Sequence, residues 1–206
     1  VVQGNLIGIH TDGTAGGNSA YGLTLEGSSD AMVGGSTTTD GNWIAGQRHA
    51  SKGYGIWIVN RTPNASMRNE VYNNKFGDVQ GTNALLGNSG AGVAITGTAS
   101  NNIIGALNQG NNFIRNGKGI YIEGASATKN TLRGNSFSCN DGRGIELNTN
   151  GNNNFGGVGS NKNVTTNISE SRANFVSGTA PAGSTVDIYV RDNNCSRVCT
   201  SDSAMG

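Results

Sequence analysis

Short apolar clusters recur along the chain, and glycine, asparagine and serine separate each cluster from the next. In one type of cluster, a glycine is followed by two aliphatic residues with a variable residue between them. This type occurs at Gly22-Leu23-Thr24-Leu25, Gly55-Ile56-Trp57-Ile58, Gly92-Val93-Ala94-Ile95, Gly119-Ile120-Tyr121-Ile122 and Gly144-Ile145-Glu146-Leu147. Alternation with a period of two is typical of β-strands that bury one face, and no segment sustains the 3.6-residue period of a helix. The pattern therefore predicts an all-β protein.

Two further types of cluster accompany the first in each repeat. One is an asparagine triplet, found at Asn5-Leu6-Ile7, Asn42-Trp43-Ile44, Asn74-Lys75-Phe76, Asn112-Phe113-Ile114 and Asn135-Ser136-Phe137. The other is a brief apolar element, found at Met32-Val33-Gly34, Val71-Tyr72, Ile103-Ile104-Gly105 and Thr131-Leu132-Arg133. Three short elements per repeat predict three short strands in each turn of a coiled chain.

The clusters recur at a nearly constant distance along the sequence. Four pairs of equivalent positions are separated by 69 to 71 residues: Asn5 and Asn74, Gly22 and Gly92, Asn42 and Asn112, and Val33 and Ile104. This agreement predicts a repeating unit that holds two turns of the chain. One turn alone cannot bury its own apolar face, so successive turns have to stack on one another.

These features together predict a right-handed parallel β-helix of about five rungs over residues 1–150, with three short strands in each rung. Glycine and asparagine tolerate the left-handed backbone conformation that sharp corners need. Asparagines at equivalent corners are expected to stack as a ladder of amide hydrogen bonds. The residues expected inside are Ile56, Ile58, Ile120 and Ile122. Those expected outside are Thr24, Trp57, Ala94, Tyr121 and Glu146 on one face, and Trp43 and Phe113 on another.

The repeat pattern ends after Leu147, where asparagine and glycine dominate the sequence. Residues 151–173 are interpreted as a cap or linker. Residues 174–206 are expected to begin a C-terminal β domain, because two apolar segments flank a Pro/Gly turn, as in a hairpin or the opening of a sandwich. Neither end of the sequence carries a terminating feature, so we expect the chain to be a piece of a longer protein.

Charge and cysteine content narrow the partners and the compartment. Charged residues make up 13% of the chain and the net charge is +1, which gives no indication of a nucleic-acid partner. No run of 18 apolar residues is present, so no membrane-spanning helix is expected. Cys195 and Cys199 are expected to form a small disulfide that leaves Cys139 unpaired, as in an oxidising compartment; free thiols are the alternative. The cysteine and histidine spacing does not match a zinc site, and no metal is expected on that ground.

The Asn-x-Ile-Gly, Gly-Thr-x-x-Gly-Asn and Gly-Ile-x-Ile elements of residues 1–150 resemble the parallel β-helix repeats of microbial surface and secreted proteins in the pectate-lyase-like superfamily. The segment from Val176 to Tyr189 resembles the β domain that often follows such repeats. The resemblance implies an extracellular or cell-surface protein, often an adhesin-like or polysaccharide-associated module and sometimes an enzyme. It implies no obligatory cofactor, although calcium is bound by some lyases of this fold.

Polysaccharide lyases of this fold use an Arg or Lys base and often calcium, whereas hydrolases use two carboxylates roughly 5–9.5 Å apart. The nearest candidates for such chemistry are Glu123 and Glu146, with Arg143 and Lys118 close to them in the sequence. No Asp/Glu cluster stands out, so we favour the interpretation that these carboxylates are merely solvated on the outer surface.

Candidate ligand-binding residues fall into two groups. Trp57 and Tyr121 are expected two rungs apart on one outer face, where flat aromatic rings could stack on sugars; packing against a neighbouring segment is the alternative. The loops between the triplet and the Gly-Ile strand carry His10, Asp12, Arg48, His49 and Lys52, for which a plain surface role is favoured. Glycosylation sequons occur at Asn60, Asn64, Asn163, Asn167 and Asn194.

The sequence thus favours a non-catalytic extracellular module, a stalk or filament segment with an adhesin-like role. Its expected partners are further copies of itself, in a filament, or surface glycans. The alternatives are a polysaccharide-active enzyme and a glycan-binding module without turnover.

Overall fold

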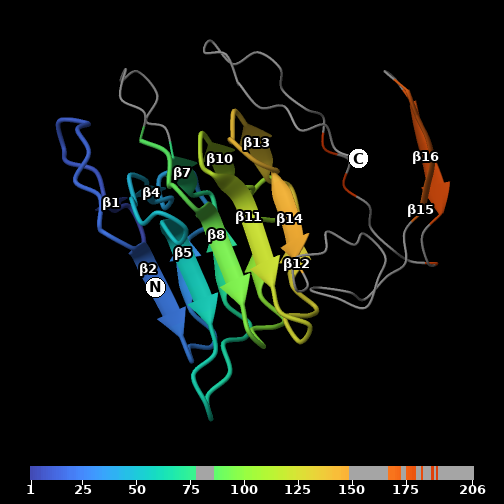
Figure 1. The fold of residues 1–206 in the computed structure, drawn as a ribbon, viewed down its shortest axis with the longest axis horizontal. Helices are drawn as coiled ribbons and strands as arrows, with labels where there is room; N and C mark the ends of the chain where they lie inside the picture. Colours follow the sequence, from blue (N-terminus) through green and yellow to red (C-terminus); the bar gives the residue numbers. More distant parts are fainter. Residues whose placement is uncertain are drawn as a thin grey trace.

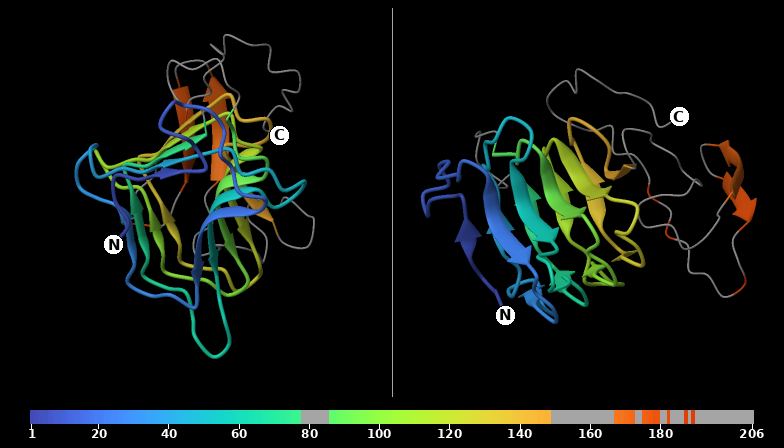
Figure 2. Two further views of the ribbon diagram at one scale, coloured as in Figure 1. Left: turned by 90° about the vertical axis from the view of Figure 1, so that its left-hand side faces the viewer. Right: turned by 60° about the horizontal axis from the view of Figure 1, so that its bottom comes forward.

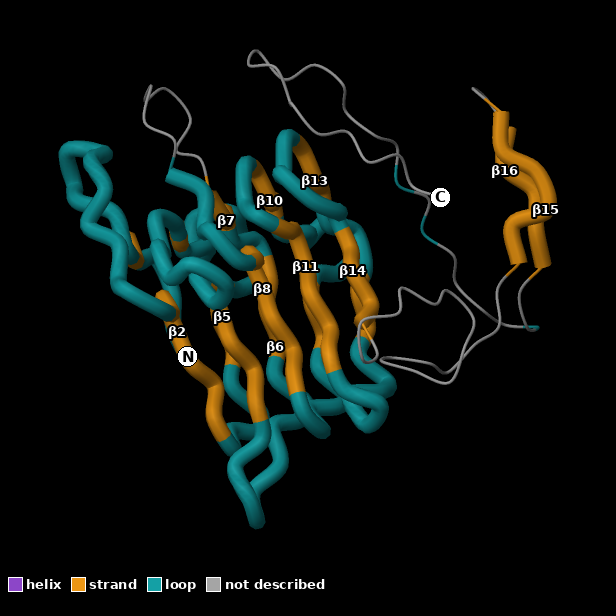
Figure 3. The backbone as a smooth tube through the Cα atoms, in the orientation of Figure 1, coloured by secondary structure: helices purple, strands orange, loops and turns teal. Residues whose placement is uncertain are grey.

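The computed structural model describes residues 1–77, 86–148, 167–172 and 175–179, together with Ala182, Asp187 and Tyr189. Within these residues the chain forms sixteen β-strands and no helix (Figures 1 and 3). Fourteen of the strands belong to three parallel sheets, and the last two form a separate antiparallel pair. The prediction of an all-β protein is therefore confirmed.

The chain visits the three sheets in turn (Figures 1 and 2). Within the described residues, each of the first four coils contributes one strand to every sheet, and the fifth contributes one strand to each of the first two. The first sheet contains β1 (Leu6–Ile7), β4 (Trp43–Ile44), β7 (Lys75–Gly77), β10 (Asn112–Ile114) and β13 (Ser136–Ser138). The second contains β2 (Tyr21–Glu26), β5 (Tyr54–Val59), β8 (Ala91–Thr96), β11 (Lys118–Glu123) and β14 (Ile145–Asn148). The third contains β3 (Met32–Gly34), β6 (Glu70–Tyr72), β9 (Ile103–Ile104) and β12 (Thr131–Leu132). This arrangement is a parallel β-helix, as the repeats predict.

The second sheet supplies the most regular part of the core. Ile56 pairs with Val93 and Val93 pairs with Ile120, and the next inward row passes from Ile58 through Ile95 to Ile122. All of these side chains are fully buried, so the predicted inward positions are confirmed. Each buried aliphatic side chain contributes roughly 1.5–3 kcal/mol, and vertical stacking lets every coil gain this stabilisation from its neighbours.

Inside the first sheet, aromatic rings stack along the coil axis. The ring of Phe113 lies 4.7 Å from that of Phe76, at an interplanar angle of 5°, and 5.1 Å from that of Phe137, at 11°. The expectation that Phe113 lies outside beside Trp43 is wrong, because Phe113 is fully buried and pairs with Phe76. The corner asparagine of that coil is Asn111 rather than Asn112, which shifts the triplet by one residue and reverses its faces.

An asparagine ladder runs along the corner that precedes the first sheet, through Asn5, Asn42, Asn74, Asn111 and Asn135. At each step the side-chain Nδ2 donates to the Oδ1 of the next coil, at 2.9–3.0 Å. The backbone N–H of the same asparagine donates to that oxygen too. From the second coil on, Nδ2 also reaches back to a backbone carbonyl of the preceding coil, as from Asn74 to Val33. The predicted ladder is confirmed.

Two more ladders, which the sequence analysis missed, occupy the other two corners. One passes through Asn69, Asn102 and Asn130 beside the third sheet. The other passes through Asn18, Gln47, Asn88, Asn116 and Asn140 beside the second sheet. Most of these amides are buried, and each ladder supplies partners for corner N–H and C=O groups that strands cannot pair.

Glycine is required where a strand of the first or third sheet ends against the next coil. Gly34 and Gly77 have φ values of 82° and 94°. A Cβ at either position would lie 1.8 Å from a backbone oxygen of the following coil, that of Tyr72 or Ile114. A side chain is therefore excluded by both the backbone conformation and the close approach.

The C-terminal segment contains one strand that the sequence analysis did not predict. β15 (Asn167–Arg172) and β16 (Phe175–Thr179) form an antiparallel hairpin, so the first strand lies within the segment that we interpreted as a linker. Phe175–Thr179 thus pairs with the residues before it. The apolar segment after the later Pro/Gly turn lies almost wholly outside the described residues, so the expected pairing across that turn stays a prediction. Residues 151–166, which make up most of the proposed linker, lie outside the described residues.

The last coil is contacted by residues far along the chain. The ring of Tyr189 meets that of Phe137 edge-on, with centroids 5.3 Å apart. The carboxylate of Asp187 accepts a hydrogen bond from the N–H of Gly134 at 2.9 Å and lies 3.7 Å from the Nε of Arg133. Tyr189 therefore covers the end of the phenylalanine stack.

Cys139, on the same coil, is bonded in a disulfide. The expectation that leaves Cys139 unpaired is therefore wrong. Cys195 and Cys199, the predicted pair, lie outside the described residues.

The neighbours Asn111 and Asn112 offer a direct test of the ladder. Asn111→Ala removes the acceptor for two donors of Asn74 and the donor to the carbonyl of Val71. We expect a loss of about 3 kcal/mol in the free energy of unfolding, measured by urea denaturation. Asn112→Ala, which removes one bond to Ser136, is expected to cost about 0.5 kcal/mol. Equal losses in the two variants would contradict the register.

The contact of Tyr189 with the last coil makes a second prediction. Tyr189→Ala is expected to speed amide hydrogen exchange in β12 and β13 by roughly tenfold, because it uncovers Phe137. Exchange in β5 and β8 is expected to stay unchanged. Tyr189→Phe keeps the ring contact and serves as the matched control. Unaltered protection of β13 in the alanine variant would exclude a capping role.

Candidate functional site

The outer face of the second sheet gathers the residues that sequence analysis selected for aromatic and carboxylate chemistry. The predicted outward row is confirmed, because the backbone register aligns Thr24, Trp57, Ala94, Tyr121 and Glu146 on successive strands. Trp57 and Tyr121 stand two rungs apart, as expected. Lys118 and Glu123 begin and end β11, and Arg143 lies just before β14.

The aromatic residues of this face pack against one another. The ring of Tyr21 lies 4.5 Å from that of Trp57 and 5.8 Å from that of Tyr54, and Tyr54 lies 6.5 Å from Tyr121. Ala94 leaves room beneath these rings and is fully buried. Tyr121 is only 8% exposed. The flat, open pair of rings expected for sugar stacking is therefore not formed, and packing accounts for the aromatic residues here.

The polar groups at the end of this face are paired. The ammonium of Lys118 lies 2.8 Å from the carboxylate of Glu146 and 4.3 Å from the ring centroid of Tyr121. Asn148 donates a hydrogen bond to the Tyr121 hydroxyl at 3.1 Å. Glu123 is exposed and pairs in register with Asn148. The carbonyl of Arg143 accepts the N–H of Gly119. Lys118 and Glu146 therefore form an ion pair, so each of these candidate residues already has a partner of opposite charge.

The loop residues lie on the edge between the first and second sheets. The hydrogen bonds of Asp12 and His49 are made within their own loops. Asp12 accepts hydrogen bonds from the hydroxyl and N–H of Thr14, which hold the pKa of its carboxyl below the ordinary value. The Nδ1 of His49 accepts the N–H groups of Ser51 and Lys52. His10 and Arg48 are exposed. The binding role expected for this group stays a prediction.

A metal centre finds no support in the part of the chain that the structure describes, where no three His, Cys, Asp or Glu side chains come together. Calcium binding therefore stays a prediction without a described site. Among the sequons, Asn64 is exposed, whereas Asn60 is half-buried and its side chain donates to the hydroxyl of Thr98. Asn167 begins β15. Asn163 and Asn194 lie outside the described residues.

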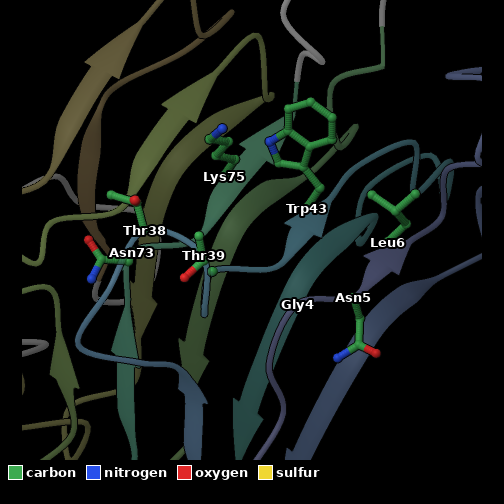
Figure 4. Close-up of a pocket in the computed structure, with 9 residues that line it drawn as sticks. Gly4, Asn5, Leu6, Thr38, Thr39, Trp43, Asn73 and Lys75 are labelled. Atoms are coloured by element: carbon green, nitrogen blue, oxygen red, sulfur yellow. The ribbon is translucent and has the colours of Figure 1, made fainter.

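Sequence reasoning missed a shallow groove on the outer face of the first sheet (Figure 4). It encloses about 250 Å³ and is lined by Leu6, Trp43 and Lys75 of successive strands and by the turn that carries Thr38 and Thr39. The signal available in the sequence was the outward position of Trp43 in its triplet. The turn residues could not be placed from the sequence, because the length of the corner loops varies.

Comparison with protein-family models, with curated proteins and with solved structures found no match. No candidate membrane-spanning helix occurs in the part of the chain that the structure describes. The parallel repeat is thus established by the structure alone, and the function has to be argued from the residues.

Tyr54 provides a titration test of the aromatic packing. Burial, with smaller contributions from Tyr121, Glu123 and Tyr21, raises the pKa of Tyr54 to about 12 from the ordinary 10.0. The folded state holds this proton more tightly than the unfolded state. Its stabilising effect is therefore complete below pH 10 and is lost as the pH rises toward 12. Ultraviolet titration of the phenolate should show a late step that Tyr54→Phe removes; a step near pH 10 would contradict the burial.

Proposed function

We propose that the chain is a non-catalytic extracellular module, a stiff β-helical stalk segment of a larger surface protein with an adhesin-like role. The observation that carries the proposal is the set of three amide ladders beside one continuous apolar core. The first four coils are joined at all three corners, and the fifth is joined to the fourth at two. Bending the stack therefore requires breaking buried hydrogen bonds. Such a scaffold suits a mechanical role in holding other parts of a protein away from a surface.

The pairing of polar groups supports a role without catalysis. Hydrolysis of a glycosidic bond needs one carboxylic acid and one free carboxylate at a set separation. The carboxylate of Glu146 forms an ion pair with Lys118, so it is not the free carboxylate of such a pair. Glu123 is exposed on the adjacent coil. The recurrence of asparagine at the corners is explained by the ladders, which need no active site to account for it.

The covered last coil bears on how such modules would associate. Repeat proteins use terminal caps to prevent stacking of one copy on the next. Contact of Tyr189 with Phe137 places a side chain where a following coil would sit. The proposal therefore favours a stalk segment over a filament that grows by addition at this end.

A glycan panel separates the proposed role from an enzymatic one. Incubation with uronate-containing and neutral polysaccharides is expected to release no reducing ends and no unsaturated products above the buffer control. Turnover that Glu146→Gln abolishes would overturn the proposal. Glu26→Gln, an exposed glutamate on β2 of the same sheet, is the matched control and should behave as the unmodified chain does.

Location is tested independently with an antibody raised against the folded chain. Intact cells of the source organism are expected to stain as strongly as permeabilised cells. Staining that appears only after permeabilisation would overturn the extracellular assignment while leaving the question of turnover to the glycan panel.

A further inference from the structure

The groove beside β1, β4 and β7 has a chemical character that the stalk role does not use. Leu6, Trp43 and Lys75 stand in one outward row, because Leu6 pairs with Trp43 and Trp43 pairs with Lys75. Leu6 is 43% exposed. The row thus offers an open aliphatic side chain, an indole ring and a cation on three neighbouring strands of one sheet (Figure 4). Neighbouring strands of a sheet lie about 4.8 Å apart.

Two hydrogen-bond donors at one end of the row lack an acceptor. The indole N–H of Trp43 is buried and has no hydrogen-bond partner. The ammonium of Lys75 lies 4.8 Å from the centroid of the Trp43 ring, and within the described residues no carboxylate pairs with it. An unmet buried donor costs about 1–3 kcal/mol. A negatively charged acceptor would satisfy the indole N–H and the ammonium together.

The rest of the lining is polar and uncharged. Lys75 is the only charged residue among those that line the groove. The hydroxyl of Thr38 makes no hydrogen bond within the described residues. The side-chain amide of Asn73, which also lines the groove, donates a hydrogen bond to the carbonyl of Gly35. The carboxylate of Asp40, which lies in the turn that carries Thr38, accepts a hydrogen bond from the N–H of Thr37. A single positive charge beside neutral hydroxyl and amide groups suits a ligand with one acidic group and several hydroxyls.

From these contacts we propose that the groove binds an acidic saccharide, with its carboxylate at Lys75 and the Trp43 N–H and its ring over Leu6. The groove, at about 250 Å³, is smaller than the roughly 300–1,000 Å³ of sites for larger ligands, so it takes one sugar residue. Lys75 is exposed at the end of a flexible stem and covers the indole. The proposal requires this side chain to move toward the carboxylate, so that the ligand can reach the indole N–H. This binding is independent of the stalk role.

The test uses fluorescence, because the chain has two tryptophans and Trp57→Phe leaves Trp43 as the sole indole. Sodium glucuronate is titrated against this variant, with glucose in matched sodium chloride as the neutral comparison. We expect a saturable change with glucuronate and none with glucose. Circular dichroism establishes that the variant is folded, and calorimetric titration of the unmodified chain gives a second measurement that does not depend on the substitution.

Two further variants assign the binding to this groove. Lys75→Gln is expected to weaken glucuronate binding roughly tenfold or more, because it removes the only charge. Lys129→Gln, at an exposed lysine in the turn before β12, is the matched control and should leave binding unchanged. A linear response without saturation, equal binding of glucose, or unaltered binding by the Lys75 variant would each overturn the proposal. None of these results would affect the test for turnover.

Discussion

The structure depends on one constraint, the need to satisfy backbone polar groups where the chain turns a corner inside a stack. Strands pair their own N–H and C=O groups along each sheet, but a corner residue has no such partner and is too deeply placed for water. A buried carboxamide resolves this because it carries a donor and an acceptor on one small group. Asn74 illustrates the solution, since its side chain reaches the coils on both sides of its own.

The same constraint explains which features could be read from the sequence. The alternation around Ile56 and Ile120 predicted strands, faces and core correctly, because the period of two is imposed by strand geometry. The first asparagine ladder was also predictable, since the triplets repeat. The register failed at Asn111 and Asn112, where two adjacent asparagines offered equivalent matches and only the packing of Phe113 distinguishes them.

Other features depend on contacts that no local pattern encodes. Gln47 is fully buried and occupies a ladder position where the other coils have asparagine, so no repeated residue type marks it in the sequence. The disulfide of Cys139 and the contact of Tyr189 with Phe137 join distant segments, so spacing in the sequence could not indicate them. The same holds for the candidate site. The sequence correctly predicted the outward row from Thr24 to Glu146. The burial of Tyr121 and the ion pair of Lys118 could not be predicted, because they depend on residues of other coils.

The ladders are also directional, since each amide oxygen accepts from the coil before it. Successive ladder residues at the first corner lie 37, 32, 37 and 24 positions apart, yet the bonds between them are the same. Every junction at this corner is thus formed by the same bonds, whatever the length of the loops between. A gene encoding such a protein can therefore gain or lose a whole coil by unequal recombination and still form the same bonds between the coils that become neighbours. The length of the β-helix can then evolve in steps of one coil, while the surface loops diversify separately.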